Sequence, residues 1–250
     1  MNQSIYSDYD DFAWFYNRYW GNLYNNQEFP VVEKLLLPYL ASQSRILDLC
    51  CGTGQLTQGL IKHGFQVTGI DSSIEMLRYA RENAPSAEFI LADARSFSLP
   101  PIYHSVLSTG NSLNHIMTLE ELKDVFKNVY ATLQVDGVFL FDVIMEEGWY
   151  SWPDSSSIVE DDNVCIWQNN NNSDERMNRA NITLFRLESK IWQRLDLTLF
   201  QKSYSESDIR SLLTKSGFSN ILAYNAIKDL KMDFHTGRVF FLAHKEILST

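Results

Sequence analysis

Short apolar segments alternate with amphipathic ones from Arg45 to Val143, and this alternation is the strongest constraint on the fold. The clearest amphipathic segment follows Thr118, where Leu122, Phe126 and Val129 share one helical face. Strands are expected at residues 45–50, 66–70, 87–92, 103–108 and 138–143. Strands and helices in this order indicate an open, doubly wound α/β sheet, and such sheets bind ligands at the carboxyl ends of their strands.

The segment before the sheet predicts two helices, from Asp10 to Trp20 and from about Gln27 to Leu40. Asp10 or Asp11 is expected to cap the first helix, and Pro30 is expected in the first turn of the second. Serine or threonine followed three residues later by an acid predicts further helix starts. This pattern occurs at Ser72, Thr118 and Ser205.

The alternation of helix and strand breaks between residues 146 and 203. Period-two patterns predict about three antiparallel strands there, at 158–167, 182–187 and 195–199. The asparagine-rich stretch 169–174 is expected to be a polar loop that holds no β-ladder. Strands near 221–224 and 238–244 would complete a seven-stranded sheet, with the last strand antiparallel at its edge. We therefore expect a core of residues 1–145 and 204–250, which includes an N-terminal helical lid, and an antiparallel insertion at 146–203.

The composition argues against several classes of protein. Lys and Arg number 21 against 31 Asp and Glu, which gives a net charge of −10. Proteins that bind nucleic acid or anionic membranes usually show a basic face, so neither partner is expected. No apolar run reaches the roughly 18 residues of a membrane span, and the acidic N-terminus is unlike a signal peptide. Three cysteines give neither a disulfide framework nor metal-ligand spacing. We expect a soluble cytoplasmic protein that acts on a small molecule.

Acidic side chains end the first three strands, at Asp48, Asp71 and Asp93. Gly52 and Gly54, after the first strand, expose backbone N–H groups where a helix begins, which suits a carboxylate or phosphate. Asp71 can accept both hydroxyls of a ribose. Asp93 can accept from an exocyclic amine, while the N–H of the next residue meets a ring nitrogen. Carboxylate, ribose and adenine in a row outline S-adenosylmethionine (SAM).

NAD is the competing ligand. Its Gly-x-Gly-x-x-Gly fingerprint needs a third glycine where this chain has Thr57. Asp48, placed just before the glycine loop, repels a pyrophosphate but welcomes the ammonium of a methionine moiety. SAM is therefore the expected cofactor. The alternatives are an oxidoreductase that uses a nicotinamide cofactor and a catalytically silent SAM-binding module.

Five segments in order resemble the motifs of class I SAM-dependent methyltransferases. They are residues 48–54 (DLCCGTG), 67–77, 91–94, 112–116 and 137–142. The insertion resembles that of a subgroup acting on small molecules, including glycine and amino-sugar N-methyltransferases. The resemblance implies a seven-stranded Rossmann-like fold, methyl transfer to nitrogen or oxygen of a small molecule, and an insertion that roofs the acceptor site.

The resemblance also implies roles for individual residues. It places Asp48, Cys51 and Gly52 at the methionine moiety and Asp71 at the ribose. It places Ser72, Met76, Asp93 and Ala94 at the adenine, and Ser108 and Thr109 near the sulfonium. A tyrosine on the N-terminal helix would close over the cofactor, with Tyr16 the expected match and Tyr9 or Tyr19 the alternatives. The chain departs from the family at Cys50, where the first motif glycine is usual, and at Asn111, where relatives often carry Asp.

His115 is the candidate catalytic residue. It follows the loop after the fourth strand, close to where a methyl acceptor must lie, so it could orient or deprotonate an amine or hydroxyl. The alternative is a histidine that only packs near the next helix. Arg186 and Arg194, on the insertion, either meet an acidic substrate or face solvent.

Overall fold

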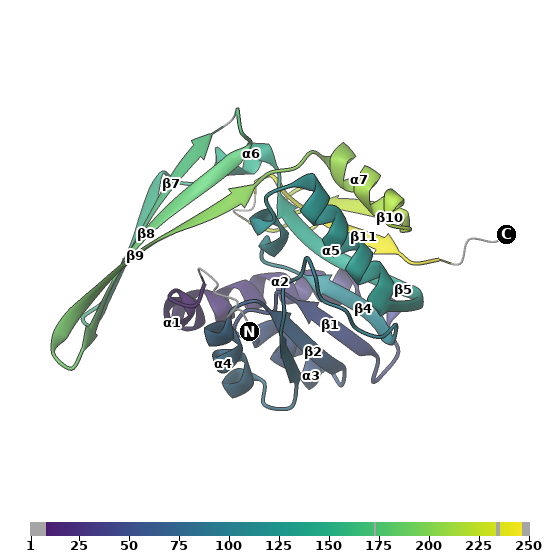
Figure 1. Ribbon diagram of the computed structural model, residues 1–250, viewed down its shortest axis with the longest axis horizontal. Coiled ribbons are helices and arrows are strands. Elements are labelled where there is room, and N and C mark those ends of the chain that lie inside the picture. The colour runs from purple at the N-terminus through teal and green to yellow at the C-terminus, as the bar shows by residue number, and fades with distance from the viewer. Residues whose placement is uncertain (1–8, 173, 234–235, 247–250) are drawn as a thin grey trace, which may run out of the picture.

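The computed structural model describes residues 9–172, 174–233 and 236–246, and Figure 1 shows its two β-sheets. Sheet A has seven strands: β1 (Arg45–Leu49), β2 (Gln66–Asp71), β3 (Glu88–Leu91), β4 (Tyr103–Ser108), β5 (Leu133–Ile144), β10 (Ser219–Asn225) and β11 (Arg238–His244). Their order is β10-β11-β5-β4-β1-β2-β3. The predicted seven-stranded, doubly wound fold is confirmed.

Strand β11 departs from the expectation for the last strand. It pairs antiparallel as predicted, but it lies between β5 and β10, so the edge belongs to β10. All seven of its residues are buried. An apolar strand such as this needs a paired neighbour on each side, which an edge position would not supply.

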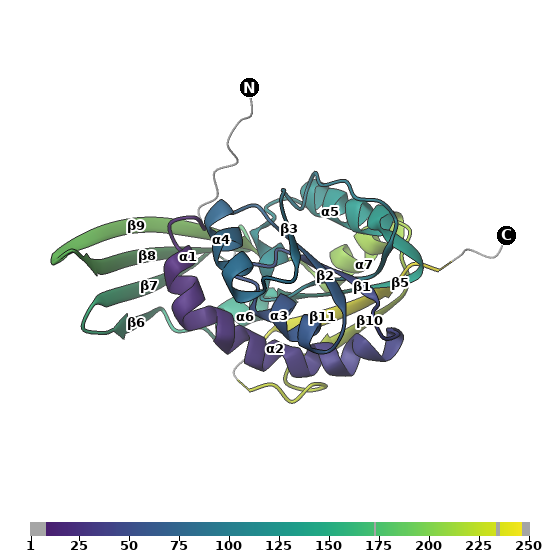
Figure 2. The same ribbon diagram turned by 90° about the horizontal axis from the view of Figure 1, so that it is seen from below.

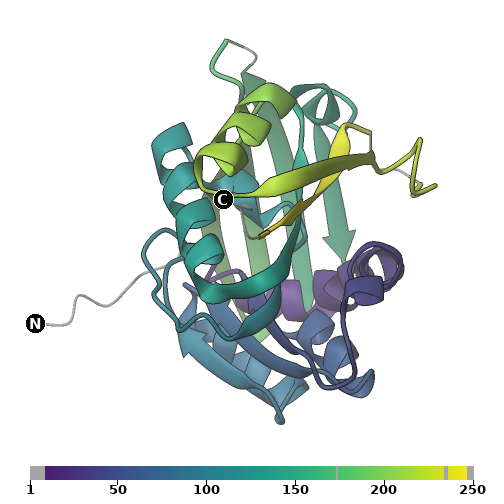
Figure 3. The same ribbon diagram turned by 90° about the vertical axis from the view of Figure 1, so that its right-hand side faces the viewer.

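Helices cover both faces of sheet A (Figure 3). On one face α5 (Leu119–Thr132) and α7 (Glu206–Lys215) bury Phe126 and Leu213; on the other, α3 (Gln55–Lys62) buries Leu60 beside the N-terminal helix. The predicted caps Thr118 and Ser205 accept from the N–H groups of Glu121 and Asp208. None of the described helices is long and apolar enough to cross a bilayer.

Helix α4 (Ile74–Asn83) is capped one residue later than predicted. Ser73 Oγ, not that of Ser72, accepts from the N–H of Met76 at 3.0 Å. The N–H of Ser73 in turn donates to Asp71 Oδ1. This shift leaves Ser72 free to line a cavity.

The N-terminal segment forms one continuous helix, so the predicted break between residues 20 and 27 is wrong. It runs through α1 (Ala13–Phe15), the π-helical turn η1 (Tyr16–Trp20) and α2 (Gly21–Leu35), and the 3₁₀ turn η2 (Leu37–Tyr39) follows. The N–H of Gly21 donates to the Tyr16 carbonyl, so Gly21 continues the helix rather than ending it. Pro30 consequently lies inside α2, not in a first turn.

The predicted cap of the first helix is also wrong. No side chain caps α1. Asp10 instead caps α4, because its Oδ1 accepts from Ser73 Oγ at 2.5 Å and from the N–H of Glu75 at 3.2 Å. The chain before α1 is thereby tied to the start of a helix about 65 residues away in the sequence.

Sheet B has four antiparallel strands rather than about three. After α6 (Glu146–Trp149) come β6 (Ser155–Val159), β7 (Asn163–Asn172), β8 (Met177–Glu188) and β9 (Ile191–Lys202). The first predicted strand is split by a hairpin at residues 160–162. The stretch 169–172 holds a ladder against β8, contrary to expectation. Asn169 and Asn171 donate to the carbonyls of Pro153 and Trp149, which offsets the low strand preference of asparagine.

Sheet B projects from the core as an arm, and its base lies across the N-terminal helix (Figures 1 and 2). Phe12 and Phe15 pack there against Ala180, Ile182 and Leu199. This third apolar cluster joins the helix to the arm, and it places both beside the carboxyl ends of the sheet A strands.

Candidate functional site

Three adjoining cavities follow the carboxyl ends of β1, β2, β3 and β4. Their volumes are about 30, 120 and 330 Å³, and Cys50 lies on the wall of all three. Eleven of the predicted site residues line them: Tyr16, Asp48, Cys51, Gly52, Asp71, Ser72, Met76, Asp93, Ala94, Thr109 and His115.

The chain also has a roomier cleft of about 500 Å³ near α6 and α7. Its Arg176 and Arg210 are paired with acids, and it lies away from these strand ends.

Two predicted cofactor residues, Gly54 and Ser108, do not line these cavities. A Cβ on Gly54 would come within 2.9 Å of Ala80 Cα, so this glycine is needed where α3 and α4 approach each other. Ser108 is fully buried, and in the described part of the chain its Oγ has no hydrogen-bond partner. Both residues shape the loops behind the cavity wall.

Asp48 is buried in the smallest cavity. Thr57 Oγ1 donates to its Oδ2 at 2.5 Å, and burial raises the pKa of Asp48 to about 7. Removal from water disfavours the carboxylate unless a cation comes close. Asp48 is therefore suited to an ammonium group. Thr57 occupies the position of the third glycine of the NAD fingerprint and is itself fully buried.

Asp71 holds the glycine loop against the start of α4. Its Oδ2 accepts from the N–H of Gly52 and its Oδ1 from that of Ser73, both at 2.9 Å. Burial raises the pKa of Asp71. Each carboxylate oxygen can accept a second hydrogen bond, so the side chain retains capacity for a diol.

Asp93 lies on the wall of the largest of the three cavities, together with Ala94. Both of its oxygens accept from Arg95, at 2.9 and 2.6 Å, and this pairing lowers the pKa of Asp93. Arg95 also donates to Glu121 at 2.8 Å. An adenine amino group at Asp93 would therefore share a carboxylate that already has a cationic partner.

Tyr16 covers the glycine loop. A Cβ built on Gly52 would lie 3.5 Å from the Tyr16 ring, so the ring is in van der Waals range of the backbone. Cys50, the departure from the family motif, adopts φ of +60°. Its side chain fits, yet its backbone has the left-handed conformation that glycine adopts at little cost.

His115 is partly buried on the walls of two cavities. Its Nδ1 lies 2.9 Å from the Phe200 carbonyl, which can only accept, so Nδ1 carries the proton. Nε2 then accepts from the Tyr9 hydroxyl at 2.9 Å. Burial lowers the pKa of His115 to about 4. The ring is thus neutral near pH 7, and its free lone pair is used to hold Tyr9.

A fourth cavity of about 50 Å³ opens between the N-terminal helix and the arm, and we call it the aromatic chamber. Its rings come from Tyr9, Phe12, Tyr16, Trp20, Tyr24, Trp152 and Trp167. Sequence reasoning missed both insertion tryptophans. Trp167 lies two residues after the buried Cys165, so the two side chains share the inward face of β7, and Trp167 pairs with Ile182 of β8. The period-two pattern was the signal that could have identified it.

Sequence reasoning also missed a buried ion cluster behind the smallest cavity. Arg238 donates to Asp142 at 2.6 Å and to Glu28 at 2.5 Å, and all three side chains are almost fully buried. Asp142 also accepts from the N–H of Asn111 at 3.0 Å. The cluster therefore anchors the loop after β4. No local pattern signals it, because Glu28 and Arg238 lie 210 positions apart.

Comparison with known proteins agrees with this geometry. Residues 46–137 match a family described as a methyltransferase domain. The crystal structure of a SAM-dependent methyltransferase from Clostridium acetobutylicum has a TM-score of 0.78 at 24% identity and covers 96% of this chain and all of its own. A putative methyltransferase of Bacillus subtilis is 31% identical over 216 residues, 82% of this chain and 86% of the relative. The chain belongs to the SAM-dependent methyltransferases.

The residues of this methyltransferase fit SAM. Its buried Asp48 suits the ammonium, Asp71 retains capacity for the ribose hydroxyls, and Met76 and Ala94 give the neighbouring walls apolar surface. Among its relatives is a glycine/sarcosine N-methyltransferase of Aphanothece halophytica. The two proteins are 28% identical over 213 residues, which cover 80% of the present chain and 74% of that relative.

Proposed function

We propose that this methyltransferase transfers a methyl group from SAM to a nitrogen of a small molecule held in the aromatic chamber. The observation that carries the proposal is the position of the chamber. It shares Tyr16 and Gly110 with the cavities of about 30 and 120 Å³, which contain Asp48 and Asp71 respectively, and it shares Tyr9 with both cavities that contain Asp71. A methyl acceptor must lie at the sulfur end of SAM, and the chamber adjoins that end.

In this proposal Asp48 binds the ammonium of SAM, Asp71 the ribose, and Asp93 with Ala94 the adenine. Tyr16 closes over the methionine end from the N-terminal helix, and Thr109 lies beside it. The arm, with Trp152 and Trp167, roofs the acceptor. These assignments use one set of neighbouring walls from β1 to β4.

SAM supplies a methyl group on positively charged sulfur, which is already an activated leaving group. The protein therefore mainly orients the acceptor and excludes water, and orientation alone contributes up to about 7–11 kcal/mol to lowering a barrier. An uncharged amine needs no strong base, whereas a hydroxyl does. His115 is a weak base whose lone pair is engaged by Tyr9. This arrangement, and the N-methyltransferase among the relatives, favour nitrogen over oxygen.

Isothermal titration calorimetry tests the cofactor assignment. The chain should bind SAM and S-adenosylhomocysteine at micromolar concentrations and NADH not at all. Asp71→Ala should weaken SAM binding by about 2–4 kcal/mol, because hydrogen bonds to charged groups contribute about 1.5–3 kcal/mol each and water compensates in part. Asp124→Ala, which removes an exposed acid on α5, serves as the control. Binding of NADH, or unchanged SAM affinity in the Asp71 variant, contradicts the assignment.

A further inference from the structure

The wall of the aromatic chamber carries no formal charge. Besides its seven rings, the described residues that line it are Gly110, Asn111 and Gln201. Gln201 Oε1 already accepts from Asn178, and its Nε2 lies 3.4 Å from His115. A carboxylate or phosphate placed in the chamber would find no cation to pair with, and an unpaired buried anion is strongly disfavoured.

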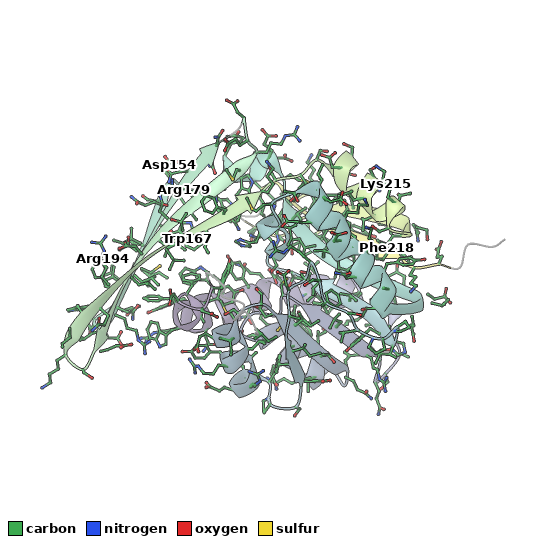
Figure 4. All side chains as sticks on the ribbon, in the orientation of Figure 1. Asp154, Trp167, Arg179, Arg194, Lys215 and Phe218 are labelled. Carbon is green, nitrogen blue, oxygen red and sulfur yellow. The ribbon has the colours of Figure 1, made fainter. Side chains whose placement is uncertain are left out.

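The arginines near the chamber are engaged elsewhere. Arg186 lies on the inward face of β8, but it stacks on Trp14 at 4.3 Å and pairs with Glu188 at 3.0 Å. Arg194 lies on the arm well away from Trp167 (Figure 4), where it pairs with Asp196 at 2.9 Å. Arg238 is held between two carboxylates. None of the three lines the chamber.

The rings themselves form a surface suited to a cation. Phe12 lies 5.3 Å from Trp20 and 5.9 Å from Trp167, and the two tryptophans lie 6.3 Å apart, centroid to centroid. The face of an aromatic ring attracts ammonium groups, and tryptophan does so most strongly. The chamber wall therefore favours positive charge over negative charge.

We propose that the acceptor is an amine that carries no anionic group, and that the aromatic chamber holds its nitrogen end as positive charge develops there. This deepens the proposed function and rests on it. The amine nitrogen forms a bond to the methyl carbon as the carbon–sulfur bond breaks and its electron pair stays on sulfur. The positive charge thus passes from sulfur to nitrogen, and any N–H proton leaves afterwards to solvent.

The size of the chamber limits what enters it. At about 50 Å³ it accommodates a compact amine head with small substituents, while the rest of the acceptor extends outward. Glycine and sarcosine, the acceptors in the name of one relative, carry a carboxylate next to the nitrogen. This chamber disfavours both, and its acceptor class therefore differs from that of the relative.

Three probes of one shape test the proposal: tetramethylammonium, tert-butanol and pivalate. Each gives a single strong methyl resonance, so binding can be followed by ligand-observed NMR with the protein saturated with S-adenosylhomocysteine. Tetramethylammonium should bind about tenfold more tightly than tert-butanol, since several cation–π contacts add to the shared apolar contact. Pivalate should not bind at the same concentrations. Equal affinity for the cation and the alcohol, or tighter binding of pivalate, overturns the proposal.

Tryptophan variants locate the binding. Trp167→Leu should weaken tetramethylammonium binding about fivefold or more, whereas Trp192→Leu, an exposed tryptophan on β9, should leave it unchanged. Circular dichroism checks that each variant folds, and Trp152→Leu replaces Trp167→Leu if the latter does not. Tetramethylammonium binding that no chamber variant weakens also overturns the proposal. Failure of SAM to bind the wild-type chain would instead contradict the proposed function, so the two failures are distinguishable.

Discussion

At the residue scale, Asp48 couples ligand binding to pH. Its pKa is about 7 in the ligand-free chain, and an ammonium ligand favours the ionised form. SAM affinity should therefore fall as the pH drops below 7, approaching about tenfold per pH unit. In Asp48→Asn the affinity should be weak throughout and nearly independent of pH. Calorimetric titrations between pH 6 and 8.5 check this, and a wild-type affinity that is constant over that range contradicts it.

The same carboxyl group affects stability. Its folded pKa of about 7 exceeds the ordinary 3.8, so between these values the folded state binds more protons than the unfolded state. The free energy of unfolding should then fall as the pH rises from about 4 to 7, by at most about 4 kcal/mol. Asp48→Asn should remove that fall. The lowered pKa of His115 has the opposite effect, because it makes the free energy of unfolding rise with pH below 6.5. Denaturant titrations must therefore compare the wild type with Asp48→Asn at each pH.

Cys50 gives a residue-scale prediction about backbone strain. Residues other than glycine are destabilised by about 1–2 kcal/mol in the left-handed backbone conformation that Cys50 adopts. Cys50→Gly should therefore be at least as stable as the wild type, despite the entropy that glycine adds to the unfolded chain. Cys50→Val should lose about 2 kcal/mol, because branching at Cβ worsens the strain. Cys165→Val, in an extended strand, is the matched control and should be nearly neutral in urea titrations.

At the scale of elements, the link between Tyr9 and His115 ties the segment before α1 to the loop after β4. If His115 acts through the Tyr9 hydroxyl, His115→Gln and Tyr9→Phe should each lower kcat about fivefold to tenfold, the value of one hydrogen bond. The double variant should be no slower than either single variant. SAM affinity should change little in all three. Multiplicative losses would show that the two side chains act independently.

The elements that sequence analysis predicted well are those whose partners are local. The strands of sheet A, the caps at Thr118 and Ser205 and the glycine loop all follow from short-range patterns. The continuity of the N-terminal helix does not follow from such patterns, because at Gly21 it depends on a π-helical turn packed under the arm. The asparagine ladder likewise depends on carbonyls at Trp149 and Pro153, which no strand propensity encodes.

The candidate site likewise has one part that could be predicted from local sequence patterns and one part that could not. The acids at the strand ends could be predicted, because a parallel sheet brings consecutive carboxyl ends to one edge. The aromatic chamber could not, since it needs the register of sheet B and the rotation of the N-terminal helix together. His115 lies on the wall of two cavities, and its catalytic role stays a prediction. The Tyr9 hydroxyl that engages it lies 106 positions away and gave no signal.

At the scale of the whole molecule, Arg238 joins α2, β5 and β11 through Glu28 and Asp142. Arg238→Met should lower the free energy of unfolding by about 3–5 kcal/mol, because it leaves two buried carboxylates without a cation. Adding Glu28→Gln and Asp142→Asn should restore most of the loss. Chemical denaturation of the single and triple variants checks this. A single variant as stable as the wild type would show that the carboxylates take up protons freely.

The ion cluster also sets an order of events during synthesis. Glu28 and Asp142 leave the ribosome long before Arg238, so a nascent chain carries both carboxylates before the guanidinium that neutralises them exists. The Asp142 carboxylate that holds the loop at Asn111 lacks its cation until β11 takes its place between β5 and β10. We therefore expect the chain to hold its methyl donor only when translation has nearly finished, even though every acid at the strand ends was made in the first half.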